Sequence, residues 1–269
     1  MSETFLDTIL ATKRARLERQ KRETDFDALK ARSLEVRQNA KKHRLQTRLA
    51  RSDRINIIAE IKRASPSKGI INDAINVTEV AKSYRDGRAA AISVLTEEDF
   101  FHGSLADLIA VKGAVDLPIL RKDFIVDEFQ IYESAAAGAD VILLIVAALP
   151  KESIKTFLRM AHDDLGMDVI VEIHDANELA IATSIGAMII GVNNRNLHSF
   201  DVSLDVSRRL IEQRPVDALM ISESGISTRE EIDELKALGY NGFLIGETLM
   251  TAGDSEMAIL RLTGANDEG

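Results

Sequence analysis

The stretch IIAEIK at residues 57–62 is a short apolar run that carries two charged side chains, Glu60 and Lys62, where it ends. Four later runs also pass from apolar to polar residues: PILRK (118–122), VIVE (169–172), MIIGVN (188–193) and LMISES (219–224). The carboxyl ends of parallel strands in one sheet lie together. If these runs are parallel neighbours, two lysines, two or three carboxylates and an amide meet in one pocket. The pattern therefore predicts a catalytic site at the strand ends.

The spacing of the apolar runs predicts the fold. From Ile55 onward they alternate with helical segments, and eight strands are expected near residues 55–61, 90–95, 117–121, 140–146, 168–173, 187–192, 218–222 and 242–246. Seven intervening helices and a final helix after Gly246 complete a (β/α)8 pattern, the TIM barrel. A doubly wound open sheet is the main alternative, but it ordinarily carries a Gly-rich fingerprint after its first strand. Here that loop reads ASPSKG, so we expect the barrel.

The region before the first strand is predicted to be helical. Residues 4–22 and 26–40 show amphipathic periodicity. The apolar stripe of the first segment consists of Phe5, Ile9, Leu10 and Leu17. We therefore predict a helical extension at residues 1–54 that packs on a barrel at residues 55–269, which forms one catalytic domain.

Composition limits the cellular setting of the protein. The chain has 269 residues and no Cys, which excludes disulfides and thiolate metal sites. It contains no apolar stretch long enough to cross a bilayer, and its N-terminus lacks the charged start and apolar middle of a signal peptide. We therefore expect a soluble, cytoplasmic protein without a membrane partner.

The net charge of −9 is distributed unevenly. Residues 1–54 carry 15 Lys and Arg against 8 Asp and Glu, whereas the rest of the chain carries 19 against 35. A basic arm can bind nucleic acid, but the cations in 13–22 and 41–54 alternate with apolar residues at helical spacing and lack interleaved aromatics. We interpret them as solvated helix faces. Together with the acidic barrel, this interpretation predicts no nucleic-acid partner.

The charges at the end of the first strand can form a pair. Side chains alternate along a strand, so Glu60 and Lys62 point to the same side. Inside a barrel mouth, each group would shift the pKa of the other. A catalytic pair and a structural salt bridge at the barrel rim both fit this spacing.

Lys122 and Glu172 end two further strands. A lysine among other cations and apolar walls has a lowered pKa and can serve as a general acid near neutral pH, whereas the alternative is an exposed loop lysine. Glu172 lies within an apolar run and requires a cationic partner, either Lys122 or Lys62. On the same face, His174 is expected to be a hydrogen-bonded residue of the rim. No second His or carboxylate stands at ligand spacing, so no metal site is predicted.

The end of the sixth strand is rich in hydrogen-bonding side chains. Asn193 and Arg195 alternate onto one side and can face the pocket. Turn stabilisation accounts for the neighbouring Asn194 and Asn196.

The last two strand ends predict a phosphate site. The segments SESGI (222–226) and LIGE (244–247) place Gly where barrels frequently bind phosphate with main-chain N–H groups. Ser224 can add a hydroxyl group. Glu247 would bind through its N–H while its carboxylate turns outward.

Taken together, these segments resemble those of indole-3-glycerol-phosphate synthases, enzymes of tryptophan biosynthesis. The matching stretches are IIAEIKRASPSKG (57–69), AISVLTEEDFFHGSLADL (91–108), LPILRKDFIVDEFQI (117–131), AGADVILLIVAAL (137–149), VIVEIHDANEL (169–179), IIGVNNRNL (189–197), ISESGI (221–226) and FLIGETLM (243–250). They include all eight expected strands, whereas the basic N-terminal region matches only loosely. The resemblance implies a carboxy-lyase that closes 1-(2-carboxyphenylamino)-1-deoxyribulose 5-phosphate to indole-3-glycerol phosphate, with loss of CO2 and water and without a cofactor.

The resemblance also implies roles for individual residues. Lys122 would be the general acid at the substrate carbonyl, and Glu172 the acid–base partner in dehydration. Lys62 would hold the substrate carboxylate or phosphate and share proton donation, while Glu60 positions it. Asn193, Ser224 and Glu223 would also contact the substrate. Its phosphate would be bound by Ser65, Gly225, Gly246 and the N–H of Glu247. Its aromatic ring would lie against an apolar wall of Phe101, Phe124 and Leu143. Core packing also accounts for Leu143, and Arg195 would brace the carboxylates.

Two other functions fit a phosphate-binding barrel. Phosphoribosylanthranilate isomerase, from the same pathway, would need a Cys and Asp pair, and the chain has no Cys. A barrel that binds a phosphorylated ligand without turnover needs neither Lys122 nor Glu172. We therefore expect an enzyme that acts on a phosphorylated small molecule, and association with other tryptophan-pathway enzymes stays open.

Overall fold

Eight parallel strands form a closed barrel in the order β1-β10-β9-β8-β7-β6-β5-β4. The computed structural model describes residues 4–66, 68–197 and 199–265. The barrel strands are β1 (Ile57–Ile61), β4 (Ala91–Leu95), β5 (Ile119–Lys122), β6 (Val141–Ile145), β7 (Asp168–Ile173), β8 (Ile189–Asn193), β9 (Leu219–Glu223) and β10 (Gly242–Ile245). The predicted (β/α)8 barrel is confirmed, and each strand begins and ends within two residues of its expected position.

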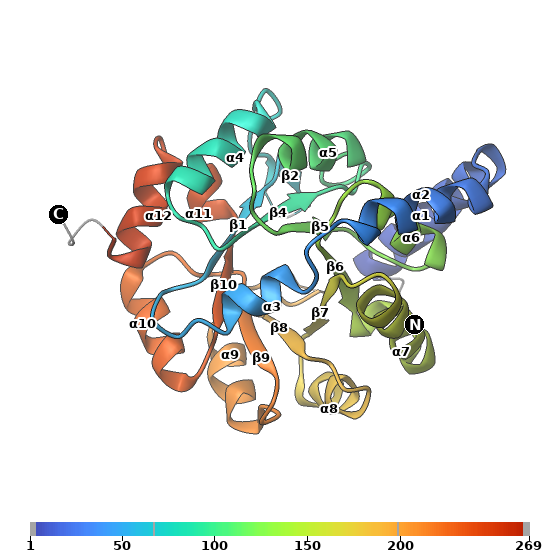
Figure 1. Ribbon diagram of the computed structural model, residues 1–269. Helices are drawn as coiled ribbons and strands as arrows, with labels where there is room; N and C mark the ends of the chain where they lie inside the picture. The colour runs from blue at the N-terminus through green and yellow to red at the C-terminus, as the bar shows by residue number, and fades with distance from the viewer. Residues whose placement is uncertain (1–3, 67, 198, 266–269) are drawn as a thin grey trace.

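Helices surround the barrel and connect successive strands (Figure 1). They are α4 (Val77–Asp86), α5 (Leu105–Ala114), α6 (Glu128–Ala136), α7 (Lys151–Arg159), α8 (Ala176–Ser184), α9 (Asp205–Leu210) and α10 (Arg229–Leu238), followed by α11 (Glu247–Met250) and α12 (Ser255–Thr263). A short hairpin of β2 (Ala64–Ser65) and β3 (Gly69–Ile70) follows β1 and was not predicted. Across the described ranges, no helix has the length and apolar character needed to traverse a bilayer.

The strands are buried on both faces, which explains their nearly continuous apolar sequences. Ile57, Ile92 and Ile119 pack outward against the helices. Ile58, Leu120 and other inward residues fill the barrel together with residues from outside the sheet. The barrel is therefore a packed core below its carboxyl ends, and the site must lie above this core.

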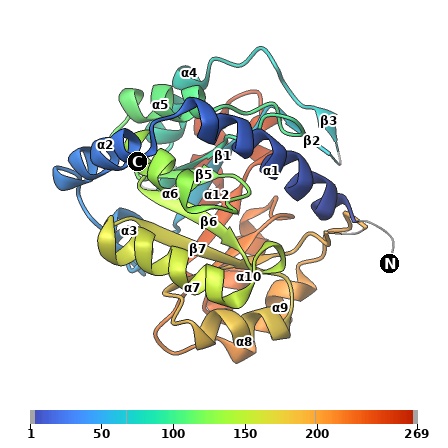
Figure 2. The same cartoon turned by 90° about the vertical axis from the view of Figure 1, so that its right-hand side faces the viewer.

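Three helices precede the barrel: α1 (Phe5–Glu23), α2 (Phe26–Gln38) and the short α3 (Arg44–Leu49), which was not predicted. Leu45 and Leu49 of α3 join the barrel interior, and Asp168 at the start of β7 accepts the N–H of Leu45 at 2.7 Å. This fixes α3 at the amino ends of the strands. Figure 2 shows α3 toward one end of the molecule, whereas the start of α1 and the β2–β3 hairpin lie toward the other.

Two basic residues of the extension are buried. Arg37 on α2 donates to the main-chain carbonyls of Ala139, Leu165 and Gly166, which ties α2 to the barrel. Lys13 on α1 is also buried, so the interpretation of 13–22 as a solvated helix face is wrong at this position. The reason is a set of barrel carboxylates that faces α1. The domain division at residue 54 stays a prediction.

We predict that Leu120→Ala destabilises the protein by about 2–5 kcal/mol, because it leaves a cavity among fully buried side chains inside the barrel. The free energy of unfolding from urea titration measures this loss. Leu238→Ala is the matched control, since Leu238 is 44% exposed at the end of α10, and its cost should stay below about 1 kcal/mol. Equal losses would contradict a packed barrel interior.

Candidate active site

A cavity of about 1000 Å³ lies at the carboxyl ends of the strands. Every site residue predicted from the sequence lines it: Glu60, Lys62, Ser65, Phe101, Lys122, Phe124, Leu143, Glu172, Asn193, Arg195, Glu223, Ser224, Gly225, Gly246 and Glu247. The strands that carry these residues are distant in sequence and neighbours in the barrel. The structure therefore brings the whole set together, and the role of each residue stays a proposal.

The first charged pair belongs to β1. Lys62 donates from Nζ to Glu60 Oε1 at 2.7 Å, as the alternation along the strand predicted. A Cβ atom at position 246, directly after β10, would collide with Glu60 Oε1, so a larger residue there would displace this carboxylate. The glycine thus makes room for the pair at the cavity wall.

The second charged group joins three strands. Lys122 Nζ, at the end of β5, donates to Glu172 Oε2 of β7 at 3.0 Å, which identifies Lys122 as the partner that Glu172 required. The same Nζ lies 3.5 Å from Glu223 Oε2 of β9. One ammonium group therefore lies within ion-pair distance of two buried carboxylates in the cavity.

The expected lowering of the Lys122 pKa is wrong. Burial does oppose the charge, but the carboxylates of Glu172, Glu223 and Glu60 outweigh it and raise the pKa of Lys122. The sequence argument assumed cationic neighbours, whereas the nearest charges are negative. Lys122 is therefore a fully protonated ammonium group at neutral pH.

The two carboxylates beside Lys122 differ in ionisation. Burial disfavours the charge of Glu172, but Lys122 and His174 outweigh it and lower its pKa. Burial raises the pKa of Glu223 to about 8; the charge of Lys122 opposes this rise, and the charges of Glu172 and Glu60 add to it. At neutral pH the site thus holds an ionised Glu172 and a protonated Glu223, a pairing typical of acid–base chemistry.

Glu223 lies deeper in the site than its sequence position suggested. A Cβ atom at position 191 of β8 would collide with its carboxylate, so Gly191 gives it space. Within the described part of the chain, neither carboxylate oxygen of Glu223 has a hydrogen-bond partner. Its carboxyl group, 3.5 Å from Lys122 but without a hydrogen bond to any described residue, lines the cavity and is able to bind a ligand there.

A hydrogen-bond chain connects three strand ends. Ser224 Oγ donates to Asn193 Oδ1 at 3.0 Å, and Asn193 Nδ2 donates to Glu172 Oε1 at 3.2 Å. The N–H of Arg195 also donates to Asn193 Oδ1, while its guanidinium donates to the carbonyl of Phe200 at 3.1 Å. The main chain of Arg195 thus contacts the amide that donates to Glu172, and a brace from Arg195 to the carboxylates stays a prediction.

His174 occupies the rim position expected of it. Its Nδ1 lies 3.1 Å from Glu178 Oε2, and its Nε2 lies 3.4 Å from Glu172 Oε1. Burial opposes the charge of the imidazole, but Glu178 and Glu172 outweigh it and raise the pKa of His174. His174 therefore supports the ionised form of Glu172 from outside the cavity.

The turns after β9 and β10 are built for close approach of a ligand. Ser224 and Gly225 both have positive φ angles, of 67° and 84°. Gly246 precedes α11, which begins at Glu247, and the carboxylate of Glu247 lies 3.1 Å from Lys68 Nζ. This ion pair joins the Glu247 side chain to the β2–β3 hairpin, and the binding of phosphate by the Glu247 N–H stays a prediction.

The apolar side of the cavity includes both predicted and unpredicted residues. Among the predicted ones, Phe101 and Phe124 lie with ring centroids 6.2 Å apart, and Leu143 belongs to both the cavity wall and the barrel core. Phe5, Leu6 and Ile9 of α1 also line the cavity. The apolar stripe at the start of α1 was the available signal for this contact.

Comparison with known proteins identifies the family. The model of the family described as indole-3-glycerol phosphate synthase matches residues 6–262. The chain belongs to the indole-3-glycerol phosphate synthase family. The indole-3-glycerol phosphate synthase of Syntrophobacter fumaroxidans is 42% identical over 261 residues, which cover 97% of this chain and 98% of that protein. That of Endomicrobium trichonymphae is 46% identical over 251 residues, which cover 93% and 96%.

Solved structures outside the indole-3-glycerol phosphate synthase family support the fold alone. The 3-hexulose-6-phosphate synthase of Salmonella typhimurium matches with a TM-score of 0.63 at 16% identity. The match covers 77% of this chain and 96% of that one. At such low identity, the likeness establishes the barrel architecture and leaves the chemistry to the site.

We predict that Glu223→Gln changes how stability depends on pH. Between about pH 4.5 and 8 the folded protein keeps the Glu223 proton that the unfolded chain loses, so wild-type stability falls as pH rises through this window. Glutamine stays neutral, so the variant lacks this dependence on pH. Between pH 5.5 and 8.5, its free energy of unfolding in urea should rise by on the order of 2 kcal/mol relative to that of the wild type.

The exposed Glu212, in the turn after α9, provides the control. The free energy of unfolding of Glu212→Gln should depend on pH as that of the wild type does over the same range. If that of Glu223→Gln does so too, the carboxyl group of Glu223 is not protonated in the folded protein at neutral pH.

Proposed function

We propose that the cavity at the strand ends is the active site at which this chain closes the indole ring. As a member of its family, the chain is a carboxy-lyase of tryptophan biosynthesis with indole-3-glycerol phosphate synthase activity, and its substrate is a phosphorylated small molecule. The reaction converts 1-(2-carboxyphenylamino)-1-deoxyribulose 5-phosphate into indole-3-glycerol phosphate, CO2 and water. The observation that supports the location is the convergence of Lys62, Lys122 and three carboxylates in one cavity.

Lys122 acts as the general acid in the first step. The aryl carbon attacks the ketone, and the carbonyl oxygen must receive a proton as the carbon–carbon bond forms. The neighbouring carboxylates keep Lys122 protonated, so the donor is present throughout the neutral pH range. Its three N–H groups allow it to hold Glu172 while it approaches the oxygen.

Glu172 and Glu223 serve the later steps. Loss of CO2 restores the aromatic ring, and dehydration then needs a base for the ring proton and an acid for the departing hydroxyl group. Glu172 is ionised and is the base, while the protonated Glu223 donates a hydrogen bond to the substrate. Their unequal pKa values suit two opposite proton transfers in one cavity.

The remaining residues bind and orient the substrate. Lys62, held by Glu60, faces the substrate carboxylate or phosphate and can share proton donation with Lys122. Phosphate occupies the turns after β9 and β10, at main-chain N–H groups near Gly225 and Glu247, with Ser65 opposite them. The anthranilate ring lies against an apolar wall formed by Phe101, Phe124 and Leu143. Asn193 and Ser224 contribute hydrogen bonds.

The sequence supports a proposal for the location and the partners of the enzyme. We propose a cytoplasmic enzyme that acts on its small-molecule substrate without a nucleic-acid or membrane partner. Its net charge of −9 and acidic barrel disfavour binding to polyanions. Association with other enzymes of tryptophan synthesis is compatible with this assignment.

We predict that Lys122→Ala lowers kcat by about 100- to 10,000-fold, since a general acid is lost from the step that forms the carbon–carbon bond. Indole fluorescence from the product, followed with the purified protein and substrate, measures the rate. Binding of inorganic phosphate should survive, because the phosphate turns lie on other strands. Lys151→Ala, on the exposed start of α7, is the control and should match wild type. Near-full turnover by Lys122→Ala would refute the proposed role.

We predict that Gly246→Ala lowers kcat/KM by about tenfold or more, because the added Cβ collides with Glu60 and displaces the carboxylate that holds Lys62. Steady-state kinetics with the same fluorescence signal measure the change. Gly253→Ala is the control, since a Cβ at that position meets nothing within 4 Å. Unchanged kinetics in Gly246→Ala would show that Glu60 has no part in positioning Lys62.

A further inference from the structure

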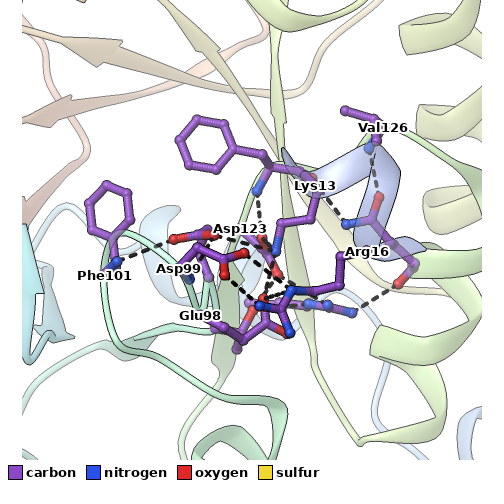
Figure 3. Close-up of polar contacts among 12 residues, drawn as sticks. Lys13, Arg16, Glu98, Asp99, Phe101, Asp123 and Val126 are labelled. Atoms are coloured by element: carbon purple, nitrogen blue, oxygen red, sulfur yellow. Dashed lines mark hydrogen bonds and ion pairs between the residues drawn. The ribbon is translucent and has the colours of Figure 1, made fainter. Parts of the chain in front are cut away.

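Helix α1 carries one buried ammonium group, that of Lys13. The Lys13 side chain is only 5% exposed, although α1 lies outside the barrel and most of its charged residues face solvent. Its Nζ lies 2.9 Å from Asp123 Oδ1, 3.0 Å from Glu98 Oε2 and 4.0 Å from Glu97 Oε1 (Figure 3). A single cation from the N-terminal extension therefore lies at the junction of two barrel loops.

The first of these loops begins at Asp123, directly after Lys122. The second carboxylate oxygen of Asp123 accepts hydrogen bonds from Thr96 Oγ1 at 2.7 Å and from Arg121 at 3.1 Å. Burial opposes the charge of Asp123, but Arg121 and Lys13 outweigh it and hold its pKa at about 2. Asp123 is thus a fixed anion, held by the barrel on one side and by α1 on the other.

The second loop follows β4 and carries Phe101. Glu97 accepts the N–H groups of Asp99, Phe100 and Phe101 at 3.1, 2.7 and 3.2 Å, which folds the loop around its carboxylate. Arg16, one turn further along α1, pairs with Asp99. Glu97, Glu98 and Asp99 form a dense acidic group, and the cations of α1 compensate it.

We propose that Lys13 is a positioning residue of the active site, which fixes Lys122 and the aromatic wall by joining Asp123 to the loop of Glu97 and Glu98. This inference rests on the proposed role of Lys122. The chain runs Lys122-Asp123-Phe124, so a displacement of Asp123 moves the general acid and one aromatic ring together. A displacement of the Glu97 loop moves Phe101, the other ring of the wall.

Electrostatics explain why a cation is needed at this junction. Without Lys13, Asp123 would keep its pair with Arg121 and Glu98 its contact with Arg16, but the cation that joins Asp123 to the loop of Glu97 and Glu98 would be lost. Like charges repel strongly where water is excluded. The loops would separate or take up water, and an error of about 1 Å in the position of a catalytic group can cost about 100-fold in rate.

Apolar contacts hold α1 in place independently of Lys13. Phe5 contacts the rings of Phe100 and Phe200 edge-on, with centroids 5.3 and 5.4 Å away. Leu6 and Leu10 pack into the barrel interior. We therefore expect α1 to stay on the barrel when the charge of Lys13 is removed. A loss of activity would then come from displaced loops and not from detachment of α1.

The test compares two lysines of α1 that make ion pairs with barrel loops. Lys13→Met removes the buried cation with little change in side-chain length. Lys21→Met is the control, since Lys21 pairs with Asp127 at 2.9 Å and is 37% exposed. Lys13→Met should lower kcat by about 10- to 100-fold and change KM by less than about threefold, whereas Lys21→Met should stay within about twofold of wild type.

The readout must separate positioning from loss of stability. Circular dichroism and thermal unfolding establish that each variant is folded at the assay temperature, so a fall in kcat reports on the site. Lys13→Arg keeps the cation, so it should recover at least about a third of the decrease in log kcat that Lys13→Met causes. If Lys13→Met does not fold, the comparison uses Lys13→Gln, which can still donate to Asp123 and should show a smaller fall.

The outcomes separate this inference from the proposed function. A lowered melting temperature with kcat within about twofold of wild type, in a folded variant, would overturn the inference. If Lys122→Ala is inactive while Lys13→Met has full activity, the function assigned to Lys122 stands and only the positioning role falls. If Lys122→Ala retains turnover, the premise fails and Lys13 has no general acid to position.

Discussion

The arrangement of the site depends on one constraint, the burial of Glu172 and Glu223 beside the ammonium group of Lys122, next to the ion pair of Glu60 and Lys62. The negative charges of Glu172 and Glu60 raise the pKa of Lys122, and its positive charge in turn stabilises Glu172 as an anion. Lys122 lies closer to Glu172 than to Glu223, and burial raises the pKa of Glu223 to about 8. An ionised carboxylate and a neutral carboxyl group therefore lie in one cavity, and we propose them as its base and its acid.

Glycines determine where these carboxylates can lie. A side chain at position 191 or 246 would occupy the space of the Glu223 or Glu60 carboxylate. Gly191 lies on β8, which pairs with the strand of Glu223, and Gly246 directly follows β10, which pairs with the strand of Glu60. The close packing of neighbouring barrel strands therefore constrains the site as strictly as the charged residues do.

The N-terminal extension is part of the site as well as part of the fold. Helix α3 closes the amino ends of the strands with Leu45 and Leu49, while α1 contributes Phe5 to the cavity and Lys13 to the loops around Lys122. In the proposed mechanism, residues outside the barrel position the catalytic groups through the loops at the carboxyl ends of the strands. The proposed chemistry belongs to the strand ends, and we infer that its precision depends on contacts with a separate helical segment.

The sequence by itself determined the barrel, the eight strands and the strand-end residues that line the cavity, because strand periodicity is local and the carboxyl ends of parallel strands must meet. It could not determine which charges become neighbours across the barrel. For that reason the direction of the Lys122 pKa shift and the solvation of Lys13 were predicted wrongly. The depth of Glu223 and the contact of α1 with the cavity likewise depend on packing between segments distant in sequence. Proton affinity is set by distances to all nearby charges and by exclusion of water, and only the tertiary structure decides both.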